Sequence, residues 1–413
     1  MKHRLRQNKK DLSAIYEAAL AAVDGRTVVA NTLDDVELSG PLFVVALGKA
    51  AAAMYQGAQQ ALGGAITQAL VISKVGHLDD LVASDVLIVC EAGHPWPTQA
   101  SLDAGQALLA FITDAPAEAR FLFLISGGAS SLVEVLAEGV SLDDVFRLND
   151  WLLSSGLDIS AMNHVRKAVS RIKGGRLAPY LQGRQALVLL ISDVPGDDPA
   201  TIGSGLLVAD GLLETEAPFE FPDWVEQLMS RASPMPATHD ASFDSIDVDV
   251  VACLADAKRA AADEARRRGY RVYEDGAVLA GDAIMVARRL ATELLNAEPG
   301  LYIWGGETTM CLPEQPGRGG RNQSLALAAA IELEGRGDVV LLAAATDGSD
   351  GPTQDAGAIV DGTTVQLAEQ LGLEAVVALA SADAGSLLAA TGSLIQTGPT
   401  GTNVMDIMIG MKL

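Results

Sequence analysis

Apolar runs of four to six residues recur along the chain, and most are followed by a glycine-containing turn. Both faces of these runs are apolar, which is typical of strands covered on two sides. The alanine-rich segment 50–62 has the composition of a helix between two such strands. The pattern predicts a parallel sheet with helices on both faces, with strands at 42–47, 69–72, 86–89, 121–125 and 186–191.

The alternation stops at 211–247, where four prolines and scattered acidic residues replace it. We interpret this stretch as a connecting region near a domain boundary. A helix is expected at 256–269, because its basic end and final glycine match C-terminal capping preferences. At 413 residues the chain is long enough for two domains, at roughly 150 residues each. Further strands are expected at 248–252, 271–273, 301–304 and 339–345.

Polar and glycine residues follow the carboxyl ends of the expected strands, which is where parallel sheets bind ligands. Lys49 follows Gly48 at a strand-to-helix turn and could meet a phosphate there, or could simply be solvated. The small-residue loop 126–131 could bind phosphates through its amides and hydroxyls. This loop matches neither GxGxxG nor GxxxxGK[ST], so it carries no dinucleotide or Walker signature.

Two acidic turns follow strands in different halves of the chain. The turn 192–199 contains three carboxylates, which suit Mg²⁺ or could accept a hydroxyl proton. Aspartate, proline and glycine are also the residues that turns prefer, so a purely structural role stays open. Asp347 and Asp350 repeat the arrangement near a later strand end. Together the two turns suggest a cleft that binds a metal nucleotide.

Cationic residues gather in two places. Segment 304–323 has two glycine pairs and the arginines Arg318 and Arg321, whose forked donors suit phosphate or carboxylate. A helix directly after it would add amide donors. Segment 163–176 is a basic helical pattern. Each segment could form the wall of an anion site, or could be a flexible loop or solvated helix face.

The overall charge narrows the function classes. The formal net charge is -24, from 29 Lys and Arg against 53 Asp and Glu, so we expect neither nucleic acid nor an acidic membrane as a partner. The three cysteines lack CxxC spacing, which fits a reducing compartment. The basic start is followed by no apolar segment typical of a secretory signal, and no run is long enough to span a bilayer. A cytoplasmic location is expected.

Taken together, these ordered motifs resemble the class II glycerate kinases, or glycerate 2-kinases, whose C-terminal module is called MOFRL. The resemblance extends from about residue 47 to residue 406. It is carried by 46–50, 73–77, 91–95, 165–167, 172–178, 191–199, 305–309, 317–323, 345–357 and 397–404.

The resemblance implies phosphoryl transfer from ATP, with Mg²⁺, to the 2-hydroxyl of D-glycerate, giving 2-phosphoglycerate and ADP. It also implies two dissimilar α/β domains with the active site in the cleft between them. The first, residues 1–235, would be a Rossmann-like three-layer domain with a parallel sheet. The second, residues 236–413, would have a mixed sheet and contain the MOFRL module at about 298–408.

The candidate site residues come from the motifs described above, and the resemblance adds which two are the leading catalytic candidates. Lys49 and Arg321 are the leading catalytic candidates, with Asp193 as a third. Nucleotide binding is expected from Ser126, Gly127, Gly128, Lys74, Gly305, Gly306 and Glu307. Substrate contacts are expected from His94, Arg166, Lys173 and Asn322, and metal contacts from Asp197, Asp347 and Asp350. The expected partners are a small hydroxy acid and a nucleotide, and a homodimer stays open.

Several positions depart from the family pattern. Ala168 stands where the family usually has histidine, Ala129 replaces a loop glycine, and Leu206 replaces a proline. These changes lie near the expected pocket loops and concern the acceptor rather than the reaction class. Three alternatives therefore accompany the main hypothesis: a kinase of a related hydroxy acid, an NAD(P)H-dependent hydroxypyruvate reductase, and a sensor without enzymatic activity.

Overall fold

The computed structural model describes residues 2–34, 36, 40–78, 80–157, 159–210 and 221–413. The chain forms two compact units. The first in sequence, here called the parallel unit, comprises residues 25–251. The other, here called the mixed unit, combines residues 1–24 with residues 252–413.

The parallel unit is built on a six-stranded sheet with the order β3-β2-β1-β4-β5-β6. The pairings that β1 makes with β2 and β4 are parallel, as are those of β2 with β3 and of β4 with β5. This is the strand order of doubly wound nucleotide-binding folds, so the predicted Rossmann-like architecture is confirmed. The strands are β1 (Leu42–Leu47), β2 (Ile66–Lys74), β3 (Leu87–Ala92), β4 (Arg120–Ile125), β5 (Ala186–Ile191) and β6 (Ile246–Ala252).

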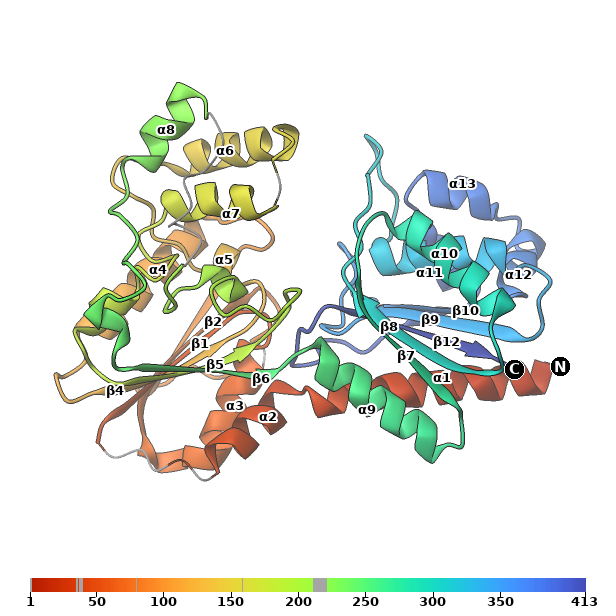
Figure 1. The fold of residues 1–413 in the computed structure, drawn as a ribbon, viewed down its shortest axis with the longest axis horizontal. Helices are drawn as coiled ribbons and strands as arrows, with labels where there is room; N and C mark the ends of the chain where they lie inside the picture. The colour runs from red at the N-terminus through yellow and green to blue at the C-terminus, as the bar shows by residue number, and fades with distance from the viewer. Residues whose placement is uncertain (1, 35, 37–39, 79, 158, 211–220) are drawn as a thin grey trace. The chain divides into compact units, whose positions relative to one another are not determined.

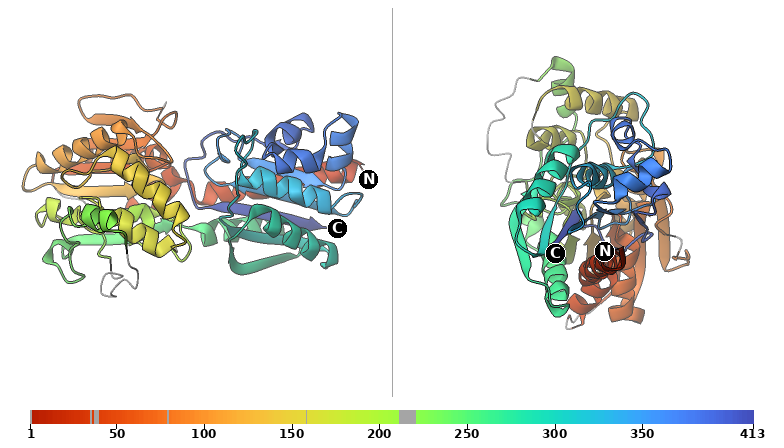
Figure 2. Two further views of the ribbon diagram at one scale, coloured as in Figure 1. Left: turned by 90° about the horizontal axis from the view of Figure 1, so that it is seen from above. Right: turned by 90° about the vertical axis from the view of Figure 1, so that its right-hand side faces the viewer.

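Helices cover both faces of this sheet, as Figures 1 and 2 show. One face carries α2 (Gly25–Leu33) and α3 (Ala51–Leu62), and the other carries α4 (Gln99–Thr113) and the short α5 (Ala129–Leu132). Beyond α4 and α5 lie α6 (Leu142–Ser154), α7 (Ile159–Ala168) and α8 (Asp223–Met229). These three helices and Val169, which follows α7, share a small core of their own, formed by Leu148, Leu152, Val165, Val169, Val225 and Leu228.

The mixed unit contains a second six-stranded sheet, with the order β11-β10-β9-β12-β8-β7. The last strand of the chain, β12, lies between β8 and β9 and is antiparallel to both, whereas β7 and β8 are parallel. The predicted mixed sheet is therefore confirmed. The strands are β7 (Val272–Leu279), β8 (Gly300–Gly306), β9 (Val339–Ala345), β10 (Gly357–Asp361), β11 (Leu394–Ile395) and β12 (Asp406–Lys412).

Two helices, α1 (Lys2–Ala22) and α9 (Leu254–Arg267), cover one face of the mixed sheet (Figure 1). The other face is covered by helices that pack around the alanine-rich α11, whose residues 322–330 are buried. They are α10 (Ala283–Asn296), α11 (Arg321–Glu332), α12 (Thr364–Gln370), α13 (Ala375–Ala380) and α14 (Ala384–Ala390).

The division into units differs from the boundary expected at 235/236. Strand β6 is the sixth strand of the parallel sheet, so the chain leaves that unit only at residue 251. Helix α1 belongs to the mixed unit because it buries Leu12, Ile15 and Ala19 there, at the spacing of one helix face. The hydroxyl of Tyr16 also donates to the carbonyl of Ala345, the last residue of β9, at 2.5 Å.

The helix expected over the basic segment 163–176 is wrong beyond Ala168, where α7 ends. Ser170 instead forms an isolated bridge with Leu136. Gly174 and Gly175 then adopt positive φ angles of 62° and 80°, which no regular helix accommodates. Of the connecting region predicted at 211–247, residues 211–220 lie outside the described residues, and the remainder contains α8 and the start of β6.

Candidate active site

Lys49 lies where β1 and its neighbour β4 end at the carboxyl edge of the parallel sheet. Its amide donates to the carbonyl of Gly127 at 2.9 Å, and the amide of Ala50 donates to Ser126 Oγ at 3.0 Å. Gly48 permits this approach, because a Cβ there would lie 2.3 Å from Ser126 Oγ. Strands β1 and β4 are the central pair, at which doubly wound sheets reverse direction and bind ligands.

The glycine pair after β4 has the chemistry of an anion site. Within the described residues, the amides of Gly127 and Gly128 have no recorded acceptor. Gly128 has a φ angle of 86°, and a Cβ there would lie 3.3 Å from both Lys49 Cγ and the His94 ring. Two open amides beside a lysine fit a phosphate group.

A cavity of about 430 Å³ opens along the same edge. Its walls come from the segments after β3, β4 and β5 and from the facing helices α6 and α7. The predicted site residues that line it are His94, Gly128, Arg166, Lys173 and Asp193. Lining residues that the sequence did not single out include Glu134, Asn149, Asn163 and Ser204.

Arg166 contributes an open cationic group to this cavity. Its Nε donates to Asn149 Oδ1 at 3.0 Å and its Nη1 to Asn163 Oδ1 at 3.3 Å. In the part of the chain that the structure describes, it has no carboxylate partner. Burial lowers the pKa of Arg166, but an arginine begins so high that it stays charged at neutral pH. The remaining N–H groups suit a carboxylate or phosphate.

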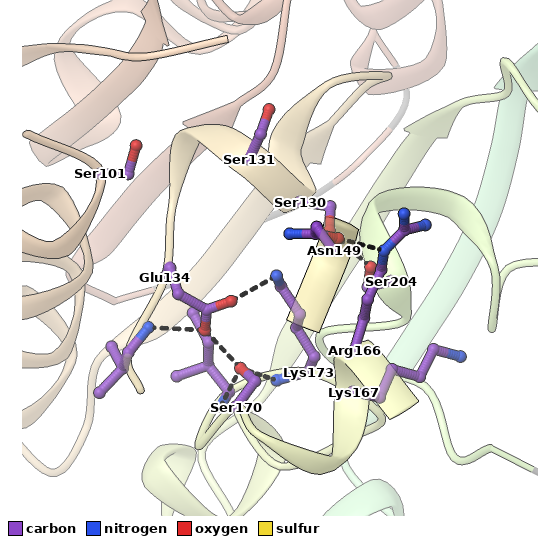
Figure 3. A network of polar contacts seen from close by, with 12 residues as sticks. Ser101, Ser130, Ser131, Glu134, Asn149, Arg166, Lys167, Ser170, Lys173 and Ser204 are labelled. Atoms are coloured by element: carbon purple, nitrogen blue, oxygen red, sulfur yellow. Dashed lines mark hydrogen bonds and ion pairs between the residues drawn. The ribbon is translucent and has the colours of Figure 1, made fainter. Parts of the chain in front are cut away.

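Lys173 lines the same cavity but is already paired. Its Nζ donates to Glu134 Oε2 at 2.5 Å, and Ser170 Oγ donates to the other oxygen of that carboxylate at 2.6 Å (Figure 3). Lys173 and Glu134 are 5% and 3% exposed, so the two charges neutralise each other away from water. The predicted role of Lys173 in binding substrate therefore stays a prediction, and its structural pairing was not foreseen.

The other cations of the basic segment are also satisfied within the protein. Lys167 donates to Asp210 at 2.7 Å and to the carbonyl of Ala200 at 3.0 Å. Arg176 donates to three backbone carbonyls, and burial lowers its pKa to about 10. Arg166 is thus the cation of this segment that faces the cavity without a carboxylate among the described residues.

His94 is held at the cavity wall by a serine. Ser131 Oγ donates to the carbonyl of Gly128 at 3.1 Å, and the His94 ring nitrogen Nδ1 lies 2.7 Å from Ser131 Oγ. A serine hydroxyl has a single proton, so His94 Nδ1 is the donor in this second bond. This contact orients the imidazole at the cavity wall.

The predicted residues of the 192–199 turn have separate positions. Asp193 lines the cavity, whereas Asp197 is half-buried with a φ angle of 54° and is not among the lining residues. Asp198 accepts from the amide of Ala200 and the hydroxyl of Thr201, which is ordinary turn chemistry. Lys74 ends β2 and, like Lys49, is not among the described residues that line the cavity.

In the mixed unit, three of the sequence motifs meet at one edge of the sheet. Asp406, the first residue of β12, pairs with Gly306 at the end of β8 and with Ala345 at the end of β9. The segments after Gly306, after Ala345 and before Asp406 therefore lie at the same edge. These are the glycine-rich segment, the second acidic turn and the loop 397–404.

Arg321 lies at this edge as the first residue of α11, where its charge opposes the helix dipole. Two carboxylates compensate for this position. Its Nε and Nη2 donate to the two oxygens of Asp406 at 2.6 and 3.0 Å, and Nη2 lies 2.9 Å from Glu307. Burial alone would lower the pKa of Arg321, but the contacts with Asp406 and Glu307 raise it above its ordinary value.

Asp350, expected to bind metal, caps the same helix. Its carboxylate accepts from the amides of Asn322 and Gln323 at 3.0 and 2.8 Å, and burial raises its pKa to about 7. Gly320 makes room for this contact, because a Cβ there would lie 2.3 Å from the Asp350 carboxyl group. The glycine-rich turn therefore permits a close approach to a side chain of the protein itself.

The other glycine pair of this segment has a packing explanation as well. Gly305 and Gly306 are the last residues of β8. A Cβ on Gly305 would lie 2.7 Å from the Leu254 side chain, and one on Gly306 would lie 2.2 Å from the carbonyl of Leu279. Their predicted role in nucleotide binding stays a prediction, since strand packing alone accounts for both glycines.

Buried polar atoms without partners also mark this edge. They belong to residues on the glycine-rich segment, on the start of α11 and on the loop before β12. Buried polar atoms are rarely left unpaired in folded proteins, so these oxygens fit a site that receives a polar ligand. Within the described residues they are Thr308 Oγ1, Asn322 Oδ1, Gln323 Oε1 and Thr402 Oγ1.

Comparison with known proteins identifies the family. A model described as "Domain of unknown function (DUF4147)" matches residues 11–218, and the MOFRL family model matches residues 300–406. A D-glycerate 2-kinase from Thermotoga maritima is 33% identical over 418 residues, covering 98% of each chain. The chain belongs to the glycerate kinase family.

A solved member of the glycerate kinase family has the same fold. The crystal structure of glycerate kinase from Thermotoga maritima matches with a TM-score of 0.84 at 33% identity, covering 99% of this chain and 100% of that one. A protein of Agrobacterium vitis, provisionally named hydroxypyruvate reductase, is also 33% identical, covering 98% of this chain and 96% of its own. Membership establishes kinase function at the level of the family.

The residues present are compatible with a magnesium nucleotide. Among the described residues there is no group of three or more His, Cys, Asp or Glu that could hold a metal ion. Mg²⁺ that accompanies a nucleotide is usually held by one or two carboxylates together with the phosphates. Asp193 in the cavity and Asp347, which accepts from the amide of Ser349 at 2.9 Å, are carboxylates of this kind. Asp197, Asp347 and Asp350 as metal ligands stay predictions.

Sequence reasoning missed Glu134, Asn149, Ser204 and Asp406. Glu134 had a visible signal, because it stands between Val133 and Val135 in a buried stretch where a charge requires a partner. Asp406 opens a strand that the sequence pattern did not reveal. No helix in the described part of the chain is long and apolar enough to cross a bilayer.

Proposed function

We propose that this chain transfers the γ-phosphoryl group of ATP, with Mg²⁺, to the 2-hydroxyl of D-glycerate, giving 2-phosphoglycerate and ADP. One observation carries the proposal. At the carboxyl edge of the parallel sheet, a cavity holds Arg166, whose recorded partners are neutral amides, and its wall includes Gly128 of the open glycine pair. Such a cavity offers separate contacts for a carboxylate and for phosphate.

The proposed roles follow from the chemistry of each group. Gly127, Gly128 and Lys49 would bind the phosphates, and Arg166 would bind the acceptor carboxylate. Mg²⁺, when bound with the nucleotide, neutralises phosphate charge during in-line transfer. Asp193 would accept the hydroxyl proton, because it is a carboxylate on the cavity wall. Arg321 is held by Asp406 and Glu307, so a ligand at its sheet edge would have to replace part of these contacts.

ADP release tests the proposal directly. The protein is assayed with ATP, Mg²⁺ and one of D-glycerate, L-glycerate or tartrate, and the phosphorylated carbon of the product is located by NMR. We expect ADP release with D-glycerate and a phosphate on carbon 2. ADP release with tartrate in preference to glycerate would show a related acid kinase. No ADP release with any of these acids would refute the proposal.

A second candidate is hydroxypyruvate reduction, because the Agrobacterium vitis relative bears that name. The strand order of the parallel unit is also that of dinucleotide-binding domains. However, the turn after β1 reads Gly48-Lys49-Ala50-Ala51-Ala52 and lacks the glycine fingerprint for a pyrophosphate. We expect no loss of NADH or NADPH absorbance when hydroxypyruvate is added without ATP. Steady cofactor oxidation would favour the reductase.

A further inference from the structure

The turn Gly203-Ser204-Gly205 has an unusual backbone. Its φ angles are 57°, 64° and 61°, so three consecutive residues lie in the left-handed region. Glycine adopts this region without strain, but a residue with a Cβ does so at a cost. Ser204 is therefore strained at a position where its two neighbours are glycines. Strain of this kind tends to persist at functional sites.

The surrounding chain holds Ser204 in this conformation. Its carbonyl accepts from the amide of Gly174 at 3.0 Å, and its own amide donates to the carbonyl of Thr201 at 3.0 Å. The next carbonyl, that of Gly205, accepts from the amide of Gly175 at 2.7 Å. The turn is thus pinned to the segment that follows Lys173, and the Ser204 side chain has a defined direction.

That direction brings Ser204 to a second serine on the cavity wall. Ser204 Oγ donates to Ser130 Oγ at 2.7 Å, and both residues line the cavity. A serine hydroxyl has one proton and two acceptor positions. Because Ser204 supplies the proton in this bond, the hydroxyl proton of Ser130 remains available. Among the described residues, no hydrogen-bond acceptor is found for this proton. Ser204 thereby turns Ser130 into a donor.

Arg166 lines the same cavity with donors to spare. A guanidinium has five N–H groups, and the recorded bonds to Asn149 and Asn163 use two of them. Figure 3 draws Arg166, Ser130 and Ser204 together at this wall. A carboxylate can accept both from a guanidinium and from a hydroxyl, whereas a neutral alcohol cannot reproduce the charged contact.

We infer that Ser130 and Arg166 bind the carboxylate of the acceptor acid, and that Ser204 is a positioning residue that orients the Ser130 hydroxyl. The inference rests on the proposed function and identifies the acceptor subsite within it. The acceptor must then be a hydroxy acid with an ionised carboxylate. Glycerol, which lacks this group, would not be a substrate.

Steady-state ADP release with the full chain tests this inference. Ser130→Ala should raise the KM for D-glycerate about 10- to 100-fold, because a hydrogen bond to a charged group is lost. The KM for ATP should change less than twofold. Ser204→Ala should raise the KM for D-glycerate about 3- to 10-fold, since Ser130 keeps its hydroxyl but loses its orientation. Wild-type protein should release no ADP with glycerol.

A comparison of stability separates positioning from simple structural damage. Ser204→Gly and Ser204→Ala both lack the hydroxyl, but only glycine relieves the strain. The glycine variant should have a Tm about 2–4 °C above that of the alanine variant, with an equally raised KM. Gln182→Gly is the matched control, because Gln182 also has a positive φ of 52° but does not line the cavity. It should leave both KM values unchanged.

The outcomes distinguish this inference from the proposed function. Wild-type turnover of D-glycerate together with an unchanged KM in Ser130→Ala would overturn the inference alone. A KM for ATP that rises as much as the KM for D-glycerate would also overturn it. If Ser204→Gly restored the wild-type KM, the hydroxyl would have no positioning role. Wild-type protein that releases no ADP with any hydroxy acid would overturn the proposed function and this inference with it.

Discussion

The parallel unit and the mixed unit each place an arginine at a sheet edge, but they treat its charge in opposite ways. Arg166 rests on two amide oxygens, so its charge is available to a ligand. Arg321 is held by Asp406 and Glu307, so its charge is already compensated. Both arginines lie in basic, polar segments of the sequence. The comparison shows that Arg166 can bind a ligand with its charge, whereas the charge of Arg321 is used within the fold.

Arg321→Ala should have the largest effect on stability. It leaves Asp406, which is fully buried, without its bidentate partner, so the free energy of unfolding should fall by about 3–5 kcal/mol. Urea denaturation followed by circular dichroism measures this. The double variant Arg321→Ala with Asp406→Asn should recover much of the loss. A loss below about 1 kcal/mol in the single variant would show that the pair is not structurally important.

Arg166→Ala should affect catalysis rather than stability. We expect kcat/KM for D-glycerate to fall about 10²- to 10³-fold, because a charged contact to the ligand is lost. Tm should change little, since the amide partners can hydrate. Arg171→Ala is the matched control, because Arg171 is exposed and its guanidinium donates to the hydroxyl of Tyr180 rather than to a group in the cavity. If Arg166→Ala lost no more activity than this control, the conclusion that Arg166, unlike Arg321, offers its charge to a ligand would be wrong.

Asp350 makes the stability of the mixed unit depend on pH. Burial raises its pKa to about 7 in the folded protein, against about 3.9 in an unfolded chain. The folded state therefore binds the proton more tightly, and stability should fall as pH rises from about 4 to above 7. Between pH 5.5 and pH 8 we expect a loss of about 1–2 kcal/mol, measured by urea denaturation at both values.

Asp350→Asn should abolish most of that pH dependence, because the amide caps α11 without titrating. Asp282→Asn controls for capping, since Asp282 caps α10 through the amides of Ile284 and Met285 at 3.0 Å. An Asp350→Asn variant with the wild-type pH dependence would assign the effect to another group.

Tyr16→Phe should have the smallest effect. It removes the hydrogen bond from α1 to the carbonyl of Ala345 at the same edge of the mixed sheet, which should cost about 1 kcal/mol of unfolding free energy. Tyr302→Phe removes a comparable bond, to the carbonyl of Glu298 at an exposed position, and should cost less. Urea denaturation measures the unfolding free energy of both variants. An equal loss of unfolding free energy in the two would show that burial does not strengthen the Tyr16 hydrogen bond.

The sequence predicted the central strands of the parallel unit well because they are apolar on both faces. The run 42–47 became β1 with every residue buried. Strand β12 was missed because its residues, Asp406–Lys412, include an internal glycine and a charge at each end. The basic segment 163–176 was predicted as one helix because charge spacing cannot show that Gly174 and Gly175 turn left-handed.

The candidate site was predictable in its residue types but not in its pairings. The cavity brings together His94, Arg166 and Asp193, which the sequence had singled out. However, the partner of Lys173 is Glu134, at a separation of 39 residues, and the partner of Arg321 is Asp406, 85 residues away. No local pattern reports such contacts, because they depend on how distant segments meet at a sheet edge.

Strand β12 lies between β8 and β9, although it follows every other strand of its sheet in the chain. During translation, β8 and β9 must therefore wait with their facing edges unpaired until residues 406–412 leave the ribosome. The parallel unit, which ends at residue 251, has no such delay. Arg321 receives the carboxylate of Asp406 only at that late moment, so a nascent chain lacking these last residues cannot assemble the edge that orients the guanidinium.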